Sequence, residues 1–197
     1  MKKKITAATI VLAALFAIVC FAIMSTPWRF VSIKASTDVS AEEFKRKMEM
    51  LDEIYETDNF SRNSEQFFSE AQERGYNEYL VPAIMCVETM GGKKVNKEEH
   101  QYNYWNLIGA YFGEEIPTIT GNIKNAYLET VDTTELEIGV RILYFEKEEE
   151  AVHYMFDCLD NHYGDVTIER FAEIWTSYDS EEYATTVYEK MQEIEDL

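Results

Sequence analysis

The chain has 197 residues, of which 46% are hydrophobic and 14% aromatic, and its formal net charge at pH 7 is −19. This composition is typical of a globular protein with one packed core, and it excludes a chain that is disordered throughout. Five of the 18 basic residues lie in the first 37 positions, which hold no acid. From Asp38 onward the chain therefore has 13 basic and 37 acidic residues, a net charge of −24. Because nucleic-acid binding needs a basic surface, we expect no nucleic-acid partner.

The N-terminal segment is the first element in chain order. Three lysines at positions 2–4 precede an uncharged, mostly apolar run of 20 residues at 5–24. About 20 apolar residues span a bilayer, whereas the apolar core of a signal peptide usually has about 7–15. Since the basic flank stays in the cytoplasm, we expect the rest of the chain to be exported. Residues 1–26 are therefore predicted to be a membrane anchor of a single-pass protein whose domain lies outside the cytoplasm. A signal peptide, cleaved to release a secreted protein, is the alternative.

A linker at residues 27–39 is predicted to lead into one domain at 40–197. Ser40 and Glu43 form a capping box, which begins a helix, and Gly75 is expected to end the next one. Apolar periodicity and such capping signals predict helices at about 40–55, 64–74, 78–90, 148–162, 168–175 and 181–195.

The pattern changes between the third and fourth predicted helices. Residues 93–107 are polar and aromatic and are predicted to form a loop. Residues 127–146, "YLETVDTTELEIGVRILYFE", are rich in Thr, Val, Ile and Tyr and are predicted to form a β-hairpin or small sheet. A mainly helical domain with one small β-element belongs to the α+β class, which is the fold class we expect.

Cys86 and Cys158 lie in apolar helical patterns of the predicted exported part. They could form a disulfide outside the cytoplasm, or they could be free thiols in the core. Neither has histidine or carboxylate partners at ligand spacing, so we expect no metal site and no cofactor.

Glu88 is the first candidate catalytic residue. It lies on the same stripe of the third predicted helix as Val81, Ile84 and Met85, at the last turn. A carboxylate there loses solvation and lies near the negative end of the helix, and both effects favour the protonated form. A protonated carboxylic acid can serve as a general acid. The alternative is that Glu88 simply ends the helix and faces water.

Glu135, in the Thr-rich segment "VDTTELEIG", is the second candidate. On its own, a glutamate in such a strand is usually just solvated. Glycoside hydrolysis, however, usually needs two carboxylates across a sugar-binding cleft. The segment between the two glutamates, "HQYNYWNLIGAYFG", carries aromatic side chains, including those of Tyr104 and Trp105. Such side chains could stack on sugars or pack in the core.

The stretch "AIMCVETMGGKK … NYWNLIGAY" resembles the "ALESGWGxS … NNLFGIK" pattern of the bacterial glucosaminidase family, whose members cleave peptidoglycan. The helix-end glutamate of that pattern matches Glu88, and its Asn-Leu-x-Gly matches the residues from Asn106 to Gly109. The family's Ser-Gly-Trp is replaced by residues 89–91, "TMG", which removes an aromatic residue beside the acid.

Two later segments extend the resemblance over roughly residues 64–197. The segment around Glu135 looks like the Thr-Thr-Glu β-lobe of the family, whose glutamate is the second catalytic carboxylate. The segment "SYDSEEYATTVYEKM" is similar to the family's "YATDPxYAxKV". Spacing places the active-site tyrosine at Tyr178 and the tyrosine of the following helix at Tyr183, whereas a direct match of "YAT" would choose Tyr183.

The resemblance implies a lysozyme-like fold with a small β-hairpin lobe. It also implies a peptidoglycan hydrolase that cleaves the β-1,4 bond on the N-acetylglucosamine side of the glycan strand. Glu88 would be the general acid, Glu135 would activate water or stabilise the transition state, and Tyr178 would contact the sugar. The substrate-binding residues would be Asn106, Gly109, Trp105, Tyr104 and Tyr183.

Other functions stay open at this point. A lytic transglycosylase or muramidase of the same fold would need only one acid/base residue. A non-catalytic domain that binds the cell wall or helps to assemble an envelope complex would need none.

Overall fold

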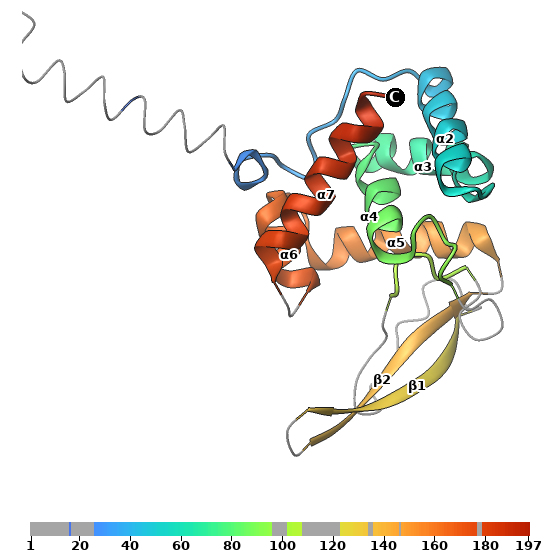
Figure 1. The fold of residues 1–197 in the computed structure, drawn as a ribbon, viewed down its shortest axis with the longest axis vertical. Coiled ribbons are helices and arrows are strands. Elements are labelled where there is room, and N and C mark those ends of the chain that lie inside the picture. Colours follow the sequence, from blue (N-terminus) through green and yellow to red (C-terminus); the bar gives the residue numbers. More distant parts are fainter. Residues whose placement is uncertain are drawn as a thin grey trace, which may run out of the picture.

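The computed structural model describes Phe16 and residues 26–95, 102–107, 123–133, 136–145, 147–176 and 179–197. Within the two strands, Phe145 is the residue whose side chain is described. The elements are η1 (Pro27–Arg29), α2 (Ala41–Tyr55), α3 (Asn59–Arg74), α4 (Leu80–Thr89), β1 (Ile123–Thr133), β2 (Leu136–Phe145), α5 (Glu148–His162), α6 (Ile168–Trp175) and α7 (Ser180–Glu195). In Figure 1, α4 lies near the centre of the helical body, with α5 running across it, α2 and α3 towards one side, and α6 and α7 towards the other.

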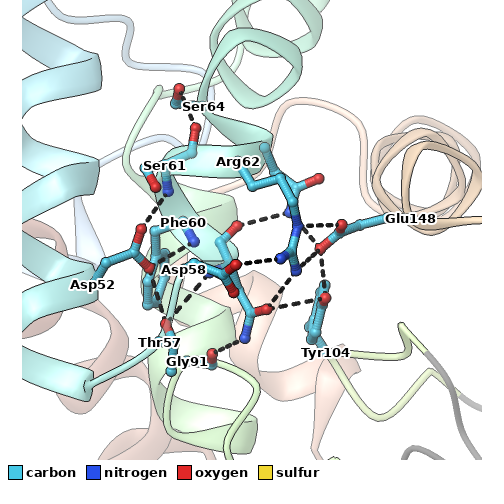
Figure 2. A network of polar contacts seen from close by, with 12 residues as sticks. Asp52, Thr57, Asp58, Phe60, Ser61, Arg62, Ser64, Gly91, Tyr104 and Glu148 are labelled. Carbon is cyan, nitrogen blue, oxygen red and sulfur yellow. Dashed lines mark hydrogen bonds and ion pairs between the residues drawn. The ribbon is translucent and has the colours of Figure 1, made fainter.

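Side-chain caps set the starts of the first two long helices. Ser40 caps α2 as predicted, accepting a hydrogen bond of 3.2 Å from the backbone N–H three residues on. Helix α3 begins at Asn59, before the predicted start at residue 64, because Asp52 of α2 caps it. The Asp52 carboxylate accepts hydrogen bonds from the backbone N–H groups of Phe60 (2.9 Å) and Ser61 (2.8 Å), as Figure 2 shows. These N–H groups have no acceptor within their own helix, so the cap from α2 stabilises the extra turn.

Helix α4 is buried along most of its length, including all of residues 80–86. Gly91 and Gly92 follow its end with φ angles of 69° and 85°. A Cβ at Gly91 would lie 2.6 Å from the ring of Phe60, and one at Gly92 would lie 2.6 Å from the side-chain nitrogen of Asn59. The two glycines therefore allow both the left-handed turn and the close approach of the chain to α3.

Residues 31–39, here called the N-terminal strap, fall in the predicted linker and pack along the helical body. Ile33 is fully buried, and its backbone N–H bonds to the connection between α5 and α6. The carboxylate of Glu78, which is 1% exposed, accepts hydrogen bonds from the hydroxyl of Ser36 (3.0 Å) and from the backbone N–H and hydroxyl of Thr37 (both 2.9 Å). The strap is thus part of the packed body.

The last three helices have the predicted boundaries to within one residue. Helices α5 and α6 cover residues 148–162 and 168–175, and α7 begins at Ser180. Thr167 caps α6 and Asp179 caps α7, each by accepting a hydrogen bond from the backbone N–H three residues on. Local capping chemistry therefore sets the starts of α6 and α7.

The predicted α+β fold class, a lysozyme-like domain with a β-lobe, is wrong. The packed body is helical, and among the described residues no strand runs through it. Among the described residues, strands β1 and β2 pair only with each other, antiparallel, and this ribbon projects away from the helices (Figure 1). Phe145, where β2 ends, is buried against Tyr154 of α5, with the ring centroids 5.5 Å apart. Residues that favour strands determine local conformation, but two strands make no layer on which helices could pack.

None of the described helices is long and apolar enough to cross a membrane. Apart from Phe16, the apolar run at residues 5–24, on which the predicted membrane anchor depends, lies outside the described residues.

Replacing Ile33 with Ala should lower the free energy of unfolding by about 2–4 kcal/mol, because it removes a fully buried side chain from the strap and leaves a cavity. Urea denaturation of the purified chain would measure the change. Phe30→Ala is the matched control, since Phe30 is 62% exposed and its loss should change stability by about 0.5 kcal/mol or less. Equal effects of the two substitutions would show that the strap contributes no packing energy.

Candidate functional site

A cavity of about 500 Å³ lies beside the C-terminal end of α4. Its walls come from α4, the turn at residues 102–107, and helices α5, α6 and α7. The lining residues are Glu88, Trp105, Asn106, Leu107, Tyr154, Cys158, His162, Tyr163, Ile174, Trp175, Thr176 and Tyr183. Among these described lining residues Glu88 is the sole carboxylate, so it dominates the charge of the cavity wall.

Three hydrogen-bond donors converge on the Glu88 carboxylate. Its Oε1 atom accepts from the indole N–H of Trp175 at 2.8 Å and from the hydroxyl of Tyr183 at 2.7 Å. Its Oε2 atom accepts from the side-chain amide of Asn106 at 3.1 Å. Glu88 is half-buried and does not simply face water. The three donors come from three different elements and fix the position of the carboxylate.

The ends of the helices bring these groups together. Glu88 is in the last turn of α4, Trp175 is the last residue of α6, and Tyr183 is in the first turn of α7. Helices α6 and α7 are both packed in the core, through Phe171 and Ala184 among others. Three helix ends therefore meet at one edge of the cavity.

The turn at residues 102–107 supplies the third donor. Asn106 has a φ of 52°, a left-handed conformation that asparagine tolerates better than most residues. Asn103 closes the turn with two hydrogen bonds to the backbone of Leu107, of 2.8 and 2.9 Å. The hydroxyl of Thr89, in α4, donates to the backbone oxygen of Tyr104 at 2.7 Å. The turn is thus fixed to the helix that carries Glu88.

The hydroxyl of Tyr183 stays protonated. Burial, and then the neighbouring negative charge of Glu88, raise the pKa of Tyr183 far above its ordinary value. Tyr183 is therefore a hydrogen-bond donor to Glu88 at any working pH. The thiol of Cys158, also in the lining, has its pKa raised to about 11 by burial, so it is a poor nucleophile.

A second carboxylate, that of Glu148, holds the turn at residues 102–107 on the side away from Glu88 (Figure 2). Glu148, the first residue of α5, accepts hydrogen bonds from Nε and Nη2 of Arg62 at 2.7 and 3.0 Å, and from Asn63 at 2.7 Å. The hydroxyl of Tyr104 donates to the same carboxylate. Burial by itself raises the pKa of Glu148, but hydrogen bonds from Arg62, Tyr104 and Asn63 and the charge of Arg62 outweigh it, and the pKa is lowered. Glu148 is therefore an ionised, fully partnered structural group.

The structure brings together five of the predicted site residues. Glu88, Asn106, Trp105 and Tyr183 line the cavity, and Tyr104, next to Trp105, accepts a backbone hydrogen bond from Thr89. Tyr104 and Trp105 are 2% and 0% exposed, and the indole N–H of Trp105 donates to a backbone oxygen of α4, so both are core residues. The remaining three predicted site residues, Glu135, Tyr178 and Gly109, lie outside the described residues.

Sequence reasoning missed Trp175 and the α5 wall of the cavity. Trp175 was expected only to end a helix. Its indole N–H, at the end of an apolar stripe, was the available signal, because such a donor needs a partner once it is buried. Cys158 and His162 on α5, and Tyr163 directly after it, carried no signal of this kind.

Cys86 and Cys158 are free thiols, not a disulfide. In the part of the chain that the structure describes, no cluster of His, Cys, Asp and Glu could hold a metal ion.

Comparisons with models of known protein families, with curated proteins and with solved structures find no match. Any functional assignment therefore depends on the residues of this chain.

Gly92→Ala should destabilise the protein by about 3 kcal/mol or more, because the new Cβ would lie 2.6 Å from Asn59 and 2.8 Å from the Tyr104 ring at a φ of 85°. Gly75→Ala is the matched control. Gly75 has a φ of 72° but nothing within 4 Å of an added Cβ, so only the backbone strain of about 1 kcal/mol should remain. Chemical denaturation of both variants would measure the difference, and equal losses would exclude close packing at Gly92.

Glu148→Gln should destabilise the protein most near neutral pH. The pKa of Glu148 is lower in the folded state, so its ionised form adds stability above the unfolded pKa of about 4.3, and this stability is lost as pH falls through the folded pKa. The difference in unfolding free energy between the unsubstituted chain and the variant should therefore shrink below about pH 4. Denaturation at several pH values would measure it, with the exposed neighbour Glu149→Gln as the control. A difference that does not change with pH would contradict the ionised assignment.

Proposed function

We propose that the chain cleaves β-1,4 glycosidic bonds of peptidoglycan on the N-acetylglucosamine side, with Glu88 as the general acid. The observation that carries this proposal is a carboxylate held by three donors on the wall of a cavity of about 500 Å³. A cavity of this size suits one or two sugar rings, and glycoside cleavage needs an acid positioned at the leaving oxygen.

The hydrogen bonds distinguish the two oxygens of Glu88. An indole N–H can only donate, so the Trp175 contact requires Oε1 to accept. Tyr183 donates to the same atom. The catalytic proton therefore belongs on Oε2. In this mechanism Oε2 delivers the proton to the glycosidic oxygen as the bond to the leaving sugar breaks.

Asn106 can partner both forms of Glu88. Its side-chain nitrogen donates to Oε2 of the carboxylate at 3.1 Å. If the amide turns over, its oxygen accepts a hydrogen bond from Oε2 of the protonated acid. Asn106 is itself exposed to solvent, so it is free to make that rotation. It would then stabilise the acid before proton transfer and the carboxylate after it.

Two classes of enzyme differ in how the oxocarbenium-like sugar reacts after the glycosidic bond breaks. In the hydrolase a second group, proposed to be Glu135, would activate water or stabilise the oxocarbenium-like transition state. A lytic transglycosylase is the second candidate, because it needs one acid/base and the described cavity lining has one carboxylate. We further propose that residues 1–26 hold the protein at the membrane with its domain outside the cytoplasm, next to peptidoglycan strands.

The first experiment is digestion of purified peptidoglycan by the full chain, with the new chain ends identified by mass spectrometry. Glu88→Gln should lower the rate by about 10²- to 10⁴-fold, the usual contribution of a general acid. Glu56→Gln is the matched control: Glu56 also stands at the end of a helix, but it is solvent-exposed and pairs with Lys93, so the rate should not change.

Each outcome has a distinct meaning. Reducing N-acetylglucosamine ends that disappear in Glu88→Gln would support the hydrolase. Anhydro ends, with near-normal activity of Glu135→Gln, would support the lytic transglycosylase. Glycan that binds but is not cut by the unsubstituted chain would refute both and indicate a wall-binding domain.

A further inference from the structure

We propose that Tyr104 and Glu148 are positioning residues: they fix the turn at residues 102–107 and, through it, hold the Asn106 amide against Glu88. This inference rests on the proposed function, in which Asn106 partners the general acid. Neither residue is among those that line the cavity, so each would act through Asn106.

The hydroxyl of Tyr104 attaches the turn to the helices on the side away from Glu88. It donates to the Glu148 carboxylate and lies 3.4 Å from the side-chain oxygen of Asn59 (Figure 2). Glu148 cannot easily shift, because Arg62 holds it with two hydrogen bonds and Asn63 with a third. The anchor therefore ties the turn to α3 and α5 together.

The connection from Tyr104 to Asn106 is short and stiff. Trp105, the one residue between them, is fully buried and bonds to the backbone of α4. The backbone oxygen of Tyr104 is held by Thr89, and Asn103 closes the turn on Leu107. A shift of the Tyr104 side chain would therefore be transmitted to the backbone of Asn106, which has a φ of 52°, and so would move the amide that this backbone carries.

The hydrogen bond between Tyr104 and Glu148 does not change its protonation at working pH. The pKa of Tyr104 is raised well above its ordinary value, by burial first and then by the bond to Glu148 and its charge. The pKa of Glu148 is lowered, because the bonds from Arg62, Tyr104 and Asn63 outweigh its burial. A donor that stays protonated and an acceptor that stays ionised give a contact of constant geometry, which suits a positioning role.

The test removes the Tyr104 hydroxyl and keeps the ring. Tyr104→Phe in the full chain should lower kcat on peptidoglycan about tenfold and leave KM within about twofold, because the Asn106 amide that partners the acid is misplaced while the cavity is intact. The matched control is Tyr76→Phe. Tyr76 is also fully buried and its hydroxyl also donates to a carboxylate, that of Asp160 at 2.9 Å, but it lies outside the cavity lining and should leave kcat unchanged.

A double-mutant cycle separates positioning from general destabilisation. If Tyr104 acts through Asn106, Tyr104→Phe should have no further effect on kcat in an Asn106→Ala background. An equal loss in both backgrounds, or no loss in either, would overturn the inference. If Tyr104→Phe fails to fold, Glu148→Asp serves the same cycle, since it keeps the charge and shortens the reach by one methylene.

A second measurement needs no activity. In the NMR spectrum of the unsubstituted chain, the side-chain amide protons of Asn106 should exchange with solvent more slowly than those of a typical exposed asparagine. Tyr104→Phe should speed their exchange and Tyr76→Phe should not; equal rates in all three proteins would overturn the inference. An unsubstituted chain that cleaves no glycan would refute the proposed function, while this measurement alone would still decide the positioning role.

Discussion

The contact between the end of α4 and the turn at residues 102–107 is the constraint on which the candidate site depends. Thr89, one residue after Glu88, donates to the backbone oxygen of Tyr104 and accepts from the backbone N–H of Gly92 at 3.0 Å. One buried hydroxyl thus links the helix end, the double glycine and the turn. Without a side chain at Gly91 or Gly92, the chain passes close enough to α3 for these bonds to form. The position of Asn106 relative to Glu88 follows from this arrangement.

In this acidic chain, buried carboxylates link separate segments of the fold by hydrogen bonds. Asp52 caps α3, Glu78 holds the N-terminal strap, and Glu148 holds the turn; each accepts several hydrogen bonds from residues of another element or segment. A buried carboxylate is stable only if such donors replace its hydration, which is why each of these groups is well partnered. A chain with few basic residues meets this need largely with backbone N–H groups and neutral side chains.

Glu88 follows the same chemistry with one difference. Two donors occupy Oε1 from within the protein, as at the structural carboxylates, but among the described residues Oε2 is bound only by the exposed amide of Asn106. The carboxylate is therefore fixed on one side and accessible from the cavity on the other. A group that is both rigid and accessible is what proton transfer to a bound substrate requires. The structural carboxylates have no such free side.

The sequence by itself determined those features that depend on neighbours a few residues away. The caps at Ser40, Thr167 and Asp179, the boundaries of α5 and α6, and the place of Glu88 on an apolar stripe all follow from periodicity and local hydrogen bonding. Glu88 and Asn106 were recognised as a pair because their motif is short, with a sequence separation of 18.

Only the tertiary structure decided the rest. The start of α3 depends on Asp52 from another helix, and the fold class depends on which elements share the core, not on which strands can form. Trp175 and Tyr183 meet Glu88 across 87 and 95 residues. No local pattern encodes these distances, because they result from the packing of whole helices against one another.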